Sequence, residues 1–305
     1  MTTIRPAGPA DLPHFHRLRT AVAPWQAGTE AGLRQRWARD DADPRAGAAR
    51  FVAERDGAVL GTGRAHLNTM TSEPGQAHVQ VIVDEPARRQ QVGSVLLARL
   101  LEHLAGVGAR RVTAWGPATL PTAGFAAGHG FRPVDESRIS RLDLANPPPA
   151  EPLPPGVTVL PWSAVDPDEL YSVDTATMAD EPGTVSFDRV SRADWDADVW
   201  TRLDLDKDLS TATLVDGRCV AVALLDADRA GGRVLSAGTG TLREFRGQGY
   251  ARLAKIEALR RAAAAGLRAA YAGNDAVNAP MLAVNTRLGY RPADIEWCYL
   301  RRLDS

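Results

Sequence analysis

The sequence predicts an α/β (α+β) protein made of two similar domains, each a mixed, mostly antiparallel sheet flanked by helices. Three observations predict this fold. Sequence landmarks recur in the same order in both halves, antiparallel strand patterns precede a strand–helix–strand pattern in each half, and a proline-rich stretch separates the halves. With 305 residues, the chain has room for two domains of ordinary size.

The duplication rests on landmarks that return after about 160 residues. The turn Asp56-Gly57 recurs as Asp216-Gly217, Arg88 recurs as Arg246, and Gly130 recurs as Gly289. An Asp-Gly pair between β-prone residues predicts a tight hairpin turn. We therefore expect each half to contain the same folding unit.

The elements of the two halves are expected in the same order. In the first half we expect a strand at 2–6, one or two helices, a hairpin at 50–55 and 58–65, a strand at 78–83, a helix at 92–107 and a strand at 111–115. In the second half the corresponding ranges are 157–161, 210–215 and 219–225, 234–242, 250–265 and 269–272. A short helix and a final strand complete each unit.

Residues 146–156 are rich in proline and predict an extended linker, because proline fixes φ and lacks an N–H donor. This linker places an N-terminal domain at residues 1–145 and a C-terminal domain at residues 157–305.

The composition excludes several classes of function. A formal net charge of -1 argues against a nucleic-acid partner, and no apolar run is long enough to span a membrane. The N-terminus lacks the apolar segment of a signal peptide. Cys219 and Cys298 make neither a disulfide framework nor a metal site. We expect a cytoplasmic protein without a metal, either a monomer or a homodimer.

The segment 236–252 carries the most informative chemistry. A strand ends, a glycine-bearing turn follows, and a helix begins at Tyr250. Unpaired N–H groups and the helix dipole attract phosphate, and Gly247 and Gly249 allow it close to the main chain. The spacing fits neither a P-loop, which needs a lysine after glycine, nor a dinucleotide fingerprint.

The pattern from Arg246 to Ala251 matches Arg/Gln-x-x-Gly-x-Gly/Ala, the pyrophosphate loop of the GNAT superfamily of acyl-CoA-dependent N-acetyltransferases. Both halves of the chain resemble this family. The resemblance implies acetyl-CoA as cosubstrate and a strand that splays from its neighbour to receive the pantetheine arm. The cofactor-binding residues that it implies are Thr241, Leu242, Arg243, Arg246, Gly247, Gln248, Gly249, Tyr250, Ala251, Arg252, Asn278 and Asn285. Asn278 is also a good N-cap, so capping alone is an alternative role.

The first half departs from the pattern. Its corresponding positions are Val83, Arg88, Gly93 and Ser94, but Gln91 stands where the central glycine belongs. We expect a side chain there to crowd the loop and to hinder a positive φ. The C-terminal domain is therefore expected to be catalytic, and the N-terminal domain either binds coenzyme A weakly or is a structural partner.

The resemblance also leaves the catalytic groups open. Many relatives have a tyrosine acid at the position of Asn285, and an amide can only donate a hydrogen bond to sulfur. The second half has no histidine, which leaves the carboxylates of Asp180, Glu181, Asp294 and Glu296 to accept a proton. Of these, Glu181 and Glu296 are the candidate bases for an amine. A main-chain N–H near Leu242 is the implied oxyanion donor.

The function predicted from these residues is transfer of an acetyl group to the primary amine of a small molecule, by direct attack in a ternary complex. Two alternatives remain: a non-catalytic acyl-CoA-binding sensor or scaffold, and a protein-lysine acetyltransferase. The segments 24–43 and 179–203 are expected to select the acceptor.

Overall fold

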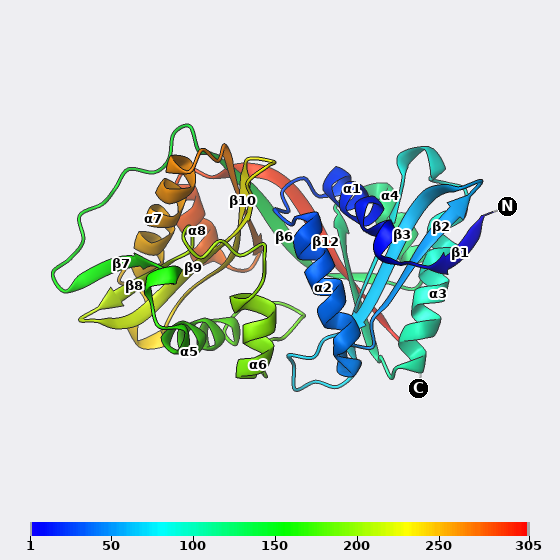
Figure 1. The fold of residues 1–305 in the computed structure, drawn as a ribbon, viewed down its shortest axis with the longest axis horizontal. Helices are drawn as coiled ribbons and strands as arrows, with labels where there is room; N and C mark the ends of the chain where they lie inside the picture. Colours follow the sequence, from blue (N-terminus) through cyan, green and yellow to red (C-terminus); the bar gives the residue numbers. More distant parts are fainter. Residues whose placement is uncertain (1, 304–305) are drawn as a thin grey trace. The chain divides into compact units, whose positions relative to one another are not determined.

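The computed structural model describes residues 2–303 of the chain, which form two compact units (Figure 1). Unit 1 contains Thr29–Glu136 with the segments up to Pro24 and from Ile295. Unit 2 contains Ser137–Asp294 with the short segment Trp25–Gly28.

Unit 1 has a six-stranded sheet in the order β1-β2-β3-β4-β5-β12, in which only β4 and β5 run parallel. Helix α3 packs on β2, β3 and β4, and helix α1 contacts β3 and β4. The elements that begin in the first half are β1 (Thr3–Pro6), α1 (Leu12–Val22), α2 (Glu30–Ala42), β2 (Ala49–Arg55), β3 (Ala58–Leu67), β4 (Gln76–Val83), α3 (Val92–Gly106), β5 (Arg111–Pro117), α4 (Leu120–Gly128) and β6 (Arg132–Asp143).

Unit 2 repeats this plan in the order β6-β11-β10-β9-β8-β7, and its parallel pair is β10 and β11. Helix α7 packs on β8 and β9, and helix α5 contacts β9 and β10. Its elements are β7 (Val157–Pro161), α5 (Pro167–Met178), α6 (Arg192–Trp195), β8 (Thr211–Val215), β9 (Arg218–Asp228), β10 (Arg233–Thr241), α7 (Tyr250–Ala264), β11 (Ala269–Asp275), α8 (Ala279–Arg287) and β12 (Arg291–Arg302). The predicted mixed sheets and their order of elements are confirmed.

Both predicted hairpin turns are present. Asp56 and Gly57 have φ values of 52° and 78°, and Asp216 and Gly217 have 49° and 83°. Two consecutive positive φ values are typical of the type I′ turn, which matches the twist of the strands it joins.

The last strand of each half lies in the sheet of the other half. From Glu296 onward, β12 pairs antiparallel with β5, while β6 from Ser137 onward pairs antiparallel with β11. In Figure 1 the strand at the red end of the chain accordingly lies in unit 1. The compact units therefore differ from the expected halves 1–145 and 157–305 in these strands.

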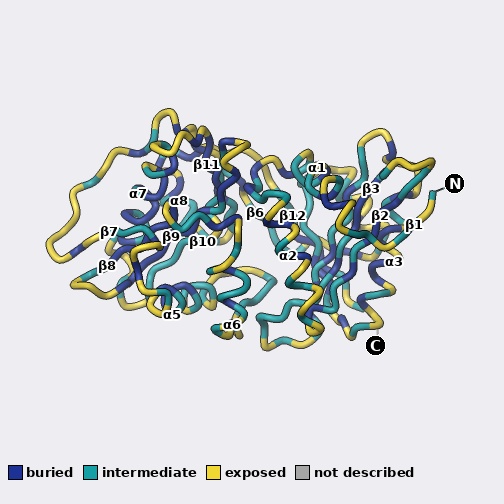
Figure 2. The backbone as a smooth tube through the Cα atoms, in the orientation of Figure 1, coloured by how far each residue is buried: buried dark blue, intermediate teal, exposed yellow. Residues whose placement is uncertain are grey.

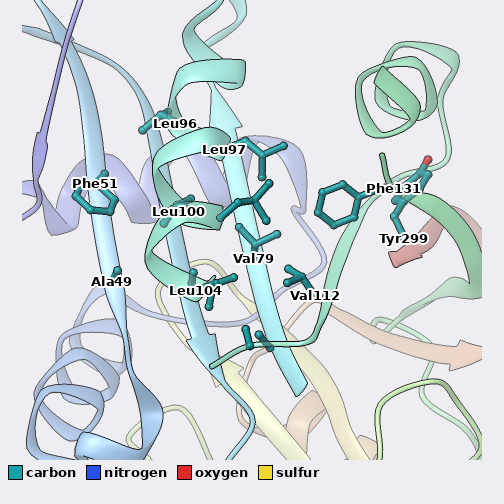
Figure 3. Packing of buried hydrophobic residues seen from close by; sticks show 14 of the residues in the cluster. Ala49, Phe51, Val79, Leu96, Leu97, Leu100, Leu104, Val112, Phe131 and Tyr299 are labelled. Atoms are coloured by element: carbon teal, nitrogen blue, oxygen red, sulfur yellow. The ribbon is translucent and has the colours of Figure 1, made fainter. Parts of the chain in front are cut away.

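The exchanged strands contribute to the cores. In unit 1, Tyr299 of β12 packs near Phe131 in a cluster that includes five leucines of α3 (Figure 3). In unit 2, Leu142 of β6 joins a cluster with Leu259 of α7. Burying such side chains stabilises a fold by about 1.5–3 kcal/mol each, so β12 and β6 are integral to these cores.

The proline-rich linker runs without helix or strand and is mostly exposed, as the yellow stretch before β7 in Figure 2 shows. Cys219 and Cys298 are both buried and are not joined in a disulfide. None of the helices within residues 2–303 combines the length and apolar character needed to cross a membrane.

Candidate active site

The parallel strands of unit 2 pair over only part of their length. Strand β10 pairs with β11 from Arg233 to Ser236, opposite Ala269 to Ala272, and no further. Beyond that point β10 still pairs with β9 on its other side, up to Thr241. One edge of β10 therefore becomes unpaired inside the sheet, where a ligand can bind the main chain.

Two glycines shape this part of β10. The register of β10 against β9 shifts between Ser236 and Gly238, as at a β-bulge. At Gly240, a Cβ atom would overlap the side chain of Thr177 on α5. Glycine at position 240 thus allows α5 to approach the strand closely.

The N–H of Leu242 does not face the unpaired edge. It donates to the carbonyl of Val220 at 3.0 Å. The oxyanion donor expected near Leu242 is therefore not the N–H of Leu242 itself. Because main-chain groups alternate along a strand, the N–H groups of Thr239 and Thr241 point toward the unpaired edge instead.

The turn before α7 leaves main-chain donors unused. Gly247 and Gly249 have φ values of 78° and 86°, and the helix begins at Tyr250. Within residues 2–303, the N–H groups of residues 247–249 donate no hydrogen bond. A Cβ at Gly247 would meet nothing within 4 Å. These donors, at the positive end of a 15-residue helix, make the turn suitable for an anionic group.

Arg246 is anchored beside this turn. Its Nε donates to the carbonyl of Thr241 at 3.1 Å, and its guanidinium pairs with Asp180. Arg243 pairs with the same carboxylate. Hydrogen bonds from Arg243 first, and from Arg246, hold the pKa of Asp180 well below its usual range. Asp180 is therefore an anion that positions the two arginines, not a base.

Other residues predicted for the cofactor lie around the same turn. Tyr250 is buried and donates from its hydroxyl to Gln248 Oε1, and Arg252 pairs with Glu151. Ala251 follows in the first turn of α7. Asn278 caps α8 as predicted, accepting from the N–H of Met281 at 3.3 Å.

Unit 1 has the same turn without the glycines. Arg89 and Gln91 have φ values of 62° and 66°, and Arg88 Nε donates to the carbonyl of Val83 at 3.2 Å. Gln91 thus adopts the positive φ that its side chain was expected to hinder, at a cost of about 1–3 kcal/mol for each such residue. Gly93 and Ser94 lie in the first turn of α3.

The strands of unit 1 also part in the same way. Strand β4 pairs with β5 only from Gln76 to His78, and the N–H of Asp84 donates to Leu60, as Leu242 does to Val220. The duplicated geometry thus covers both the strand opening and the turn.

Residues 13–131 match the model of the acetyltransferase (GNAT) family. A solved structure of a tandem GNAT protein from the clavulanic acid biosynthesis pathway superimposes with a TM-score of 0.75 at 20% identity, covering 100% of this chain and 99% of that one. The chain has a tandem GNAT fold.

Two curated relatives are named mycothiol acetyltransferase. The protein of Actinosynnema mirum is 28% identical over 82% of this chain and 84% of its own length. That of Catenulispora acidiphila is 32% identical over 49% of this chain, and the match spans only 48% of that relative. The family match lies in the first half, whose turn lacks the two glycines. The expectation that unit 2 is the catalytic one therefore rests on its own motif from Arg246 to Ala251.

In the GNAT pattern Asn285 holds the tyrosine position, and the structure places its side chain inside unit 2. Its Oδ1 accepts from Lys255 Nζ at 2.8 Å, and its Nδ2 donates to Asn274 Oδ1 at 2.6 Å. Asn285 is 2% exposed. Both ends of the amide are therefore committed to protein partners.

Lys255 is the residue that sequence reasoning missed. It is 2% exposed on α7, and burial lowers its pKa to about 7. The sequence held one signal: Lys255 is one of only two lysines and lies between Ala254 and Ile256 in a helix whose neighbours are apolar. A buried lysine needs polar partners, which Asn285 supplies.

The two candidate bases lie in different units. Glu181 is exposed, yet nearby protein atoms first, and then the negative charge of Asp275, raise the pKa of its carboxyl. Asp275 ends β11, beyond the point where β10 has parted from it. Glu296 instead pairs with Pro117 in the sheet of unit 1. The structure thus brings Glu181, but not Glu296, to the unit that contains the glycine turn.

Proposed function

We propose that unit 2 binds acetyl-CoA and transfers its acetyl group to the primary amine of a small molecule, by direct attack in a ternary complex. The observation that carries this proposal is the set of unused N–H groups at residues 247–249, beside the edge where β10 leaves β11. The relatives named mycothiol acetyltransferase favour a small-molecule acceptor over a protein.

The residues present fit this cosubstrate. The N–H groups of the turn and the guanidinium of Arg246 hold the diphosphate, while Arg252 lies one helical turn away. The N–H groups of Thr239 and Thr241 bind the pantetheine arm and the thioester oxygen along the unpaired edge. Bound acetyl-CoA supplies an acyl group activated as a thioester.

Glu181 is the proposed base. An aliphatic amine with a pKa near ~10 is mostly protonated at neutral pH and must lose a proton before attack. A carboxylate whose pKa is raised accepts a proton more readily than an ordinary one, and Glu181 is such a group near the end of β11. Since Asn285 is an amide bonded inside the unit, the thiolate takes its proton from solvent.

A second candidate is an acetyl-CoA site in unit 1. The family match covers residues 13–131, and Arg88 makes the contact to Val83 that Arg246 makes to Thr241. This candidate has the same turn conformation but bulkier residues at the closest approach.

Calorimetric titration with acetyl-CoA tests the proposal, using two variants matched in backbone strain. Gly249 and Gly266 both have a positive φ, 86° and 82°, but Gly266 follows the end of α7, far along the helix from the turn. We expect Gly249→Val to abolish binding to unit 2 and Gly266→Val to retain it. Retained affinity and stoichiometry in Gly249→Val would contradict the assignment.

Turnover separates an enzyme from a sensor. We expect thiol release from acetyl-CoA in the presence of some members of a panel of small amines, and none with lysine peptides. Tight binding of acetyl-CoA without thiol release in the presence of any of the amines would favour the non-catalytic sensor.

A further inference from the structure

The face of the unit 1 sheet opposite α3 carries polar side chains at its centre. Glycines 61 and 63 on β3 point toward leucines of α3, so Arg64 and His66 point to the other face. Arg64 Nε donates to Gln80 Oε1 of β4 at 3.1 Å. This bond fixes the plane of the guanidinium and leaves its two terminal nitrogens available.

Two histidines lie next to this arginine. His66 is paired in register with His78, and their ring centroids are 5.7 Å apart. Their enclosed position, followed by the charge of Arg64, lowers the pKa of His66 to about 3. The pKa of His78 is lowered as well, by burial and then by His66. Both imidazoles are therefore neutral at pH 7, and each offers one N–H donor.

The surroundings are positively charged. Burial, then the charges of Arg19 on α1 and Arg36 on α2, lower the pKa of Arg64 to about 9, so that it remains a cation at neutral pH. The nearby carboxylate of Asp40 pairs with Arg39 and Arg50 instead. Within residues 2–303 Arg64 forms no ion pair.

Arg64 is half-buried, and a guanidinium that loses part of its solvation without gaining a carboxylate partner is costly for the fold. A fixed guanidinium edge with neutral N–H donors beside it matches the oxygens of a planar or tetrahedral oxyanion. The cost is therefore offset when such an anion binds.

We propose that Arg64, His66 and His78 form a binding site for a small molecule that carries a carboxylate or phosphate group. The site lies in unit 1 and is independent of acetyl-CoA binding by unit 2. It gives the first half of the chain a ligand of its own.

Titration with sodium succinate and, separately, with inorganic phosphate tests this site at constant ionic strength set with chloride. The readout is the imidazole carbon-bound protons in NMR spectra, assigned with His66→Gln and His78→Gln. We expect saturable shifts of these two histidines, and a pKa of His66 that rises when the anion is bound. The anion that binds more tightly identifies the group on the ligand.

Arg64→Gln removes the charge, and Arg64→Lys keeps the charge but loses the planar edge. We expect Arg64→Gln to weaken anion binding by about tenfold or more, because it removes the charge-assisted hydrogen bonds to the anion. Without added anion, Arg64→Gln should unfold at a higher temperature than the wild type. The control Arg132→Gln, at an exposed arginine of the same unit, should change neither property.

Two results would overturn the proposal. One is the absence of saturable shifts at His66 and His78 with both anions. The other is equal affinity of wild type and Arg64→Gln for the anion, which would place any binding elsewhere, for example at the turns before α3 and α7.

Discussion

Lys255 Nζ donates a hydrogen bond to Asn285 Oδ1 across 2.8 Å inside unit 2. The ammonium also lies 5.4 Å from the centre of the Tyr290 ring, so the lysine has one amide and one aromatic face as partners. Neither partner carries a negative charge. The pair links α7 to α8. It also keeps the side chain of Asn285, which stands where many GNAT relatives have a tyrosine, directed into the protein.

This arrangement predicts a pH-dependent stability. The folded pKa of Lys255 is about 7, whereas the unfolded chain has a value near ~10.4, so the unfolded state binds more protons between these limits. Wild-type stability relative to Lys255→Met should therefore rise between about pH 7 and 10, by about 1.4 kcal/mol per pH unit. Urea unfolding of both proteins across this range measures the slope. A difference that is independent of pH would show that Lys255 is not desolvated.

Gly240 predicts a steric effect at the unpaired strand. A Cβ there overlaps Thr177, whereas a Cβ at Gly238 comes no closer than 3.4 Å to Leu224. We expect Gly240→Ala to lower the free energy of unfolding by about 1–3 kcal/mol and Gly238→Ala to change it much less. Chemical denaturation of the two variants decides this, and equal effects would mean that α5 does not press on β10.

Glu181 predicts a change in the pH–rate profile. The base must be deprotonated to act, so kcat/KM should rise with pH through a pKa above the ordinary value of glutamate. We expect Glu181→Gln to lower kcat/KM by about 10²–10⁴-fold and to remove this acidic limb. Glu257→Gln, at a carboxylate that pairs with Arg261 on α7, serves as the control and should leave the profile unchanged. An unaltered acidic limb in Glu181→Gln would assign the base to another group.

The turn before α3 predicts a stabilising substitution. Gln91 has a φ of 66°, which glycine adopts without strain. We expect Gln91→Gly to raise the free energy of unfolding by up to about 1 kcal/mol. The neighbour Gln90 lacks a positive φ, so Gln90→Gly should be destabilising. Thermal unfolding measures both effects. A change in melting temperature of the same sign for both variants would contradict this interpretation of the loop.

The sequence predicted local elements better than their partners. The hairpin turns at Asp56 and Asp216 and the cap at Asn278 depend on neighbouring residues and were all confirmed. The exchange of β6 and β12 could not be predicted, because each follows an equivalent helix and either strand fits the alternation of either sheet.

In the candidate site, too, features set by neighbouring residues were predicted better than features set by residues far away in the sequence. The Arg246 turn was predicted with its two glycines, since short-range spacing determines it. The inward position of Asn285 depends on Lys255, which lies 30 residues away on another helix. The direction of the Leu242 N–H depends on pairing with β9, which sequence spacing alone does not reveal.

The most direct test compares Arg246→Ala with Arg88→Ala, which remove the same contact in the two units. The measurement is acetyl-CoA-dependent thiol release with a responsive amine from the panel. Our account predicts that Arg246→Ala loses most of this activity and that Arg88→Ala keeps it. Loss of activity in Arg88→Ala, with activity retained in Arg246→Ala, would place acetyl transfer in unit 1 and contradict the assignment to unit 2.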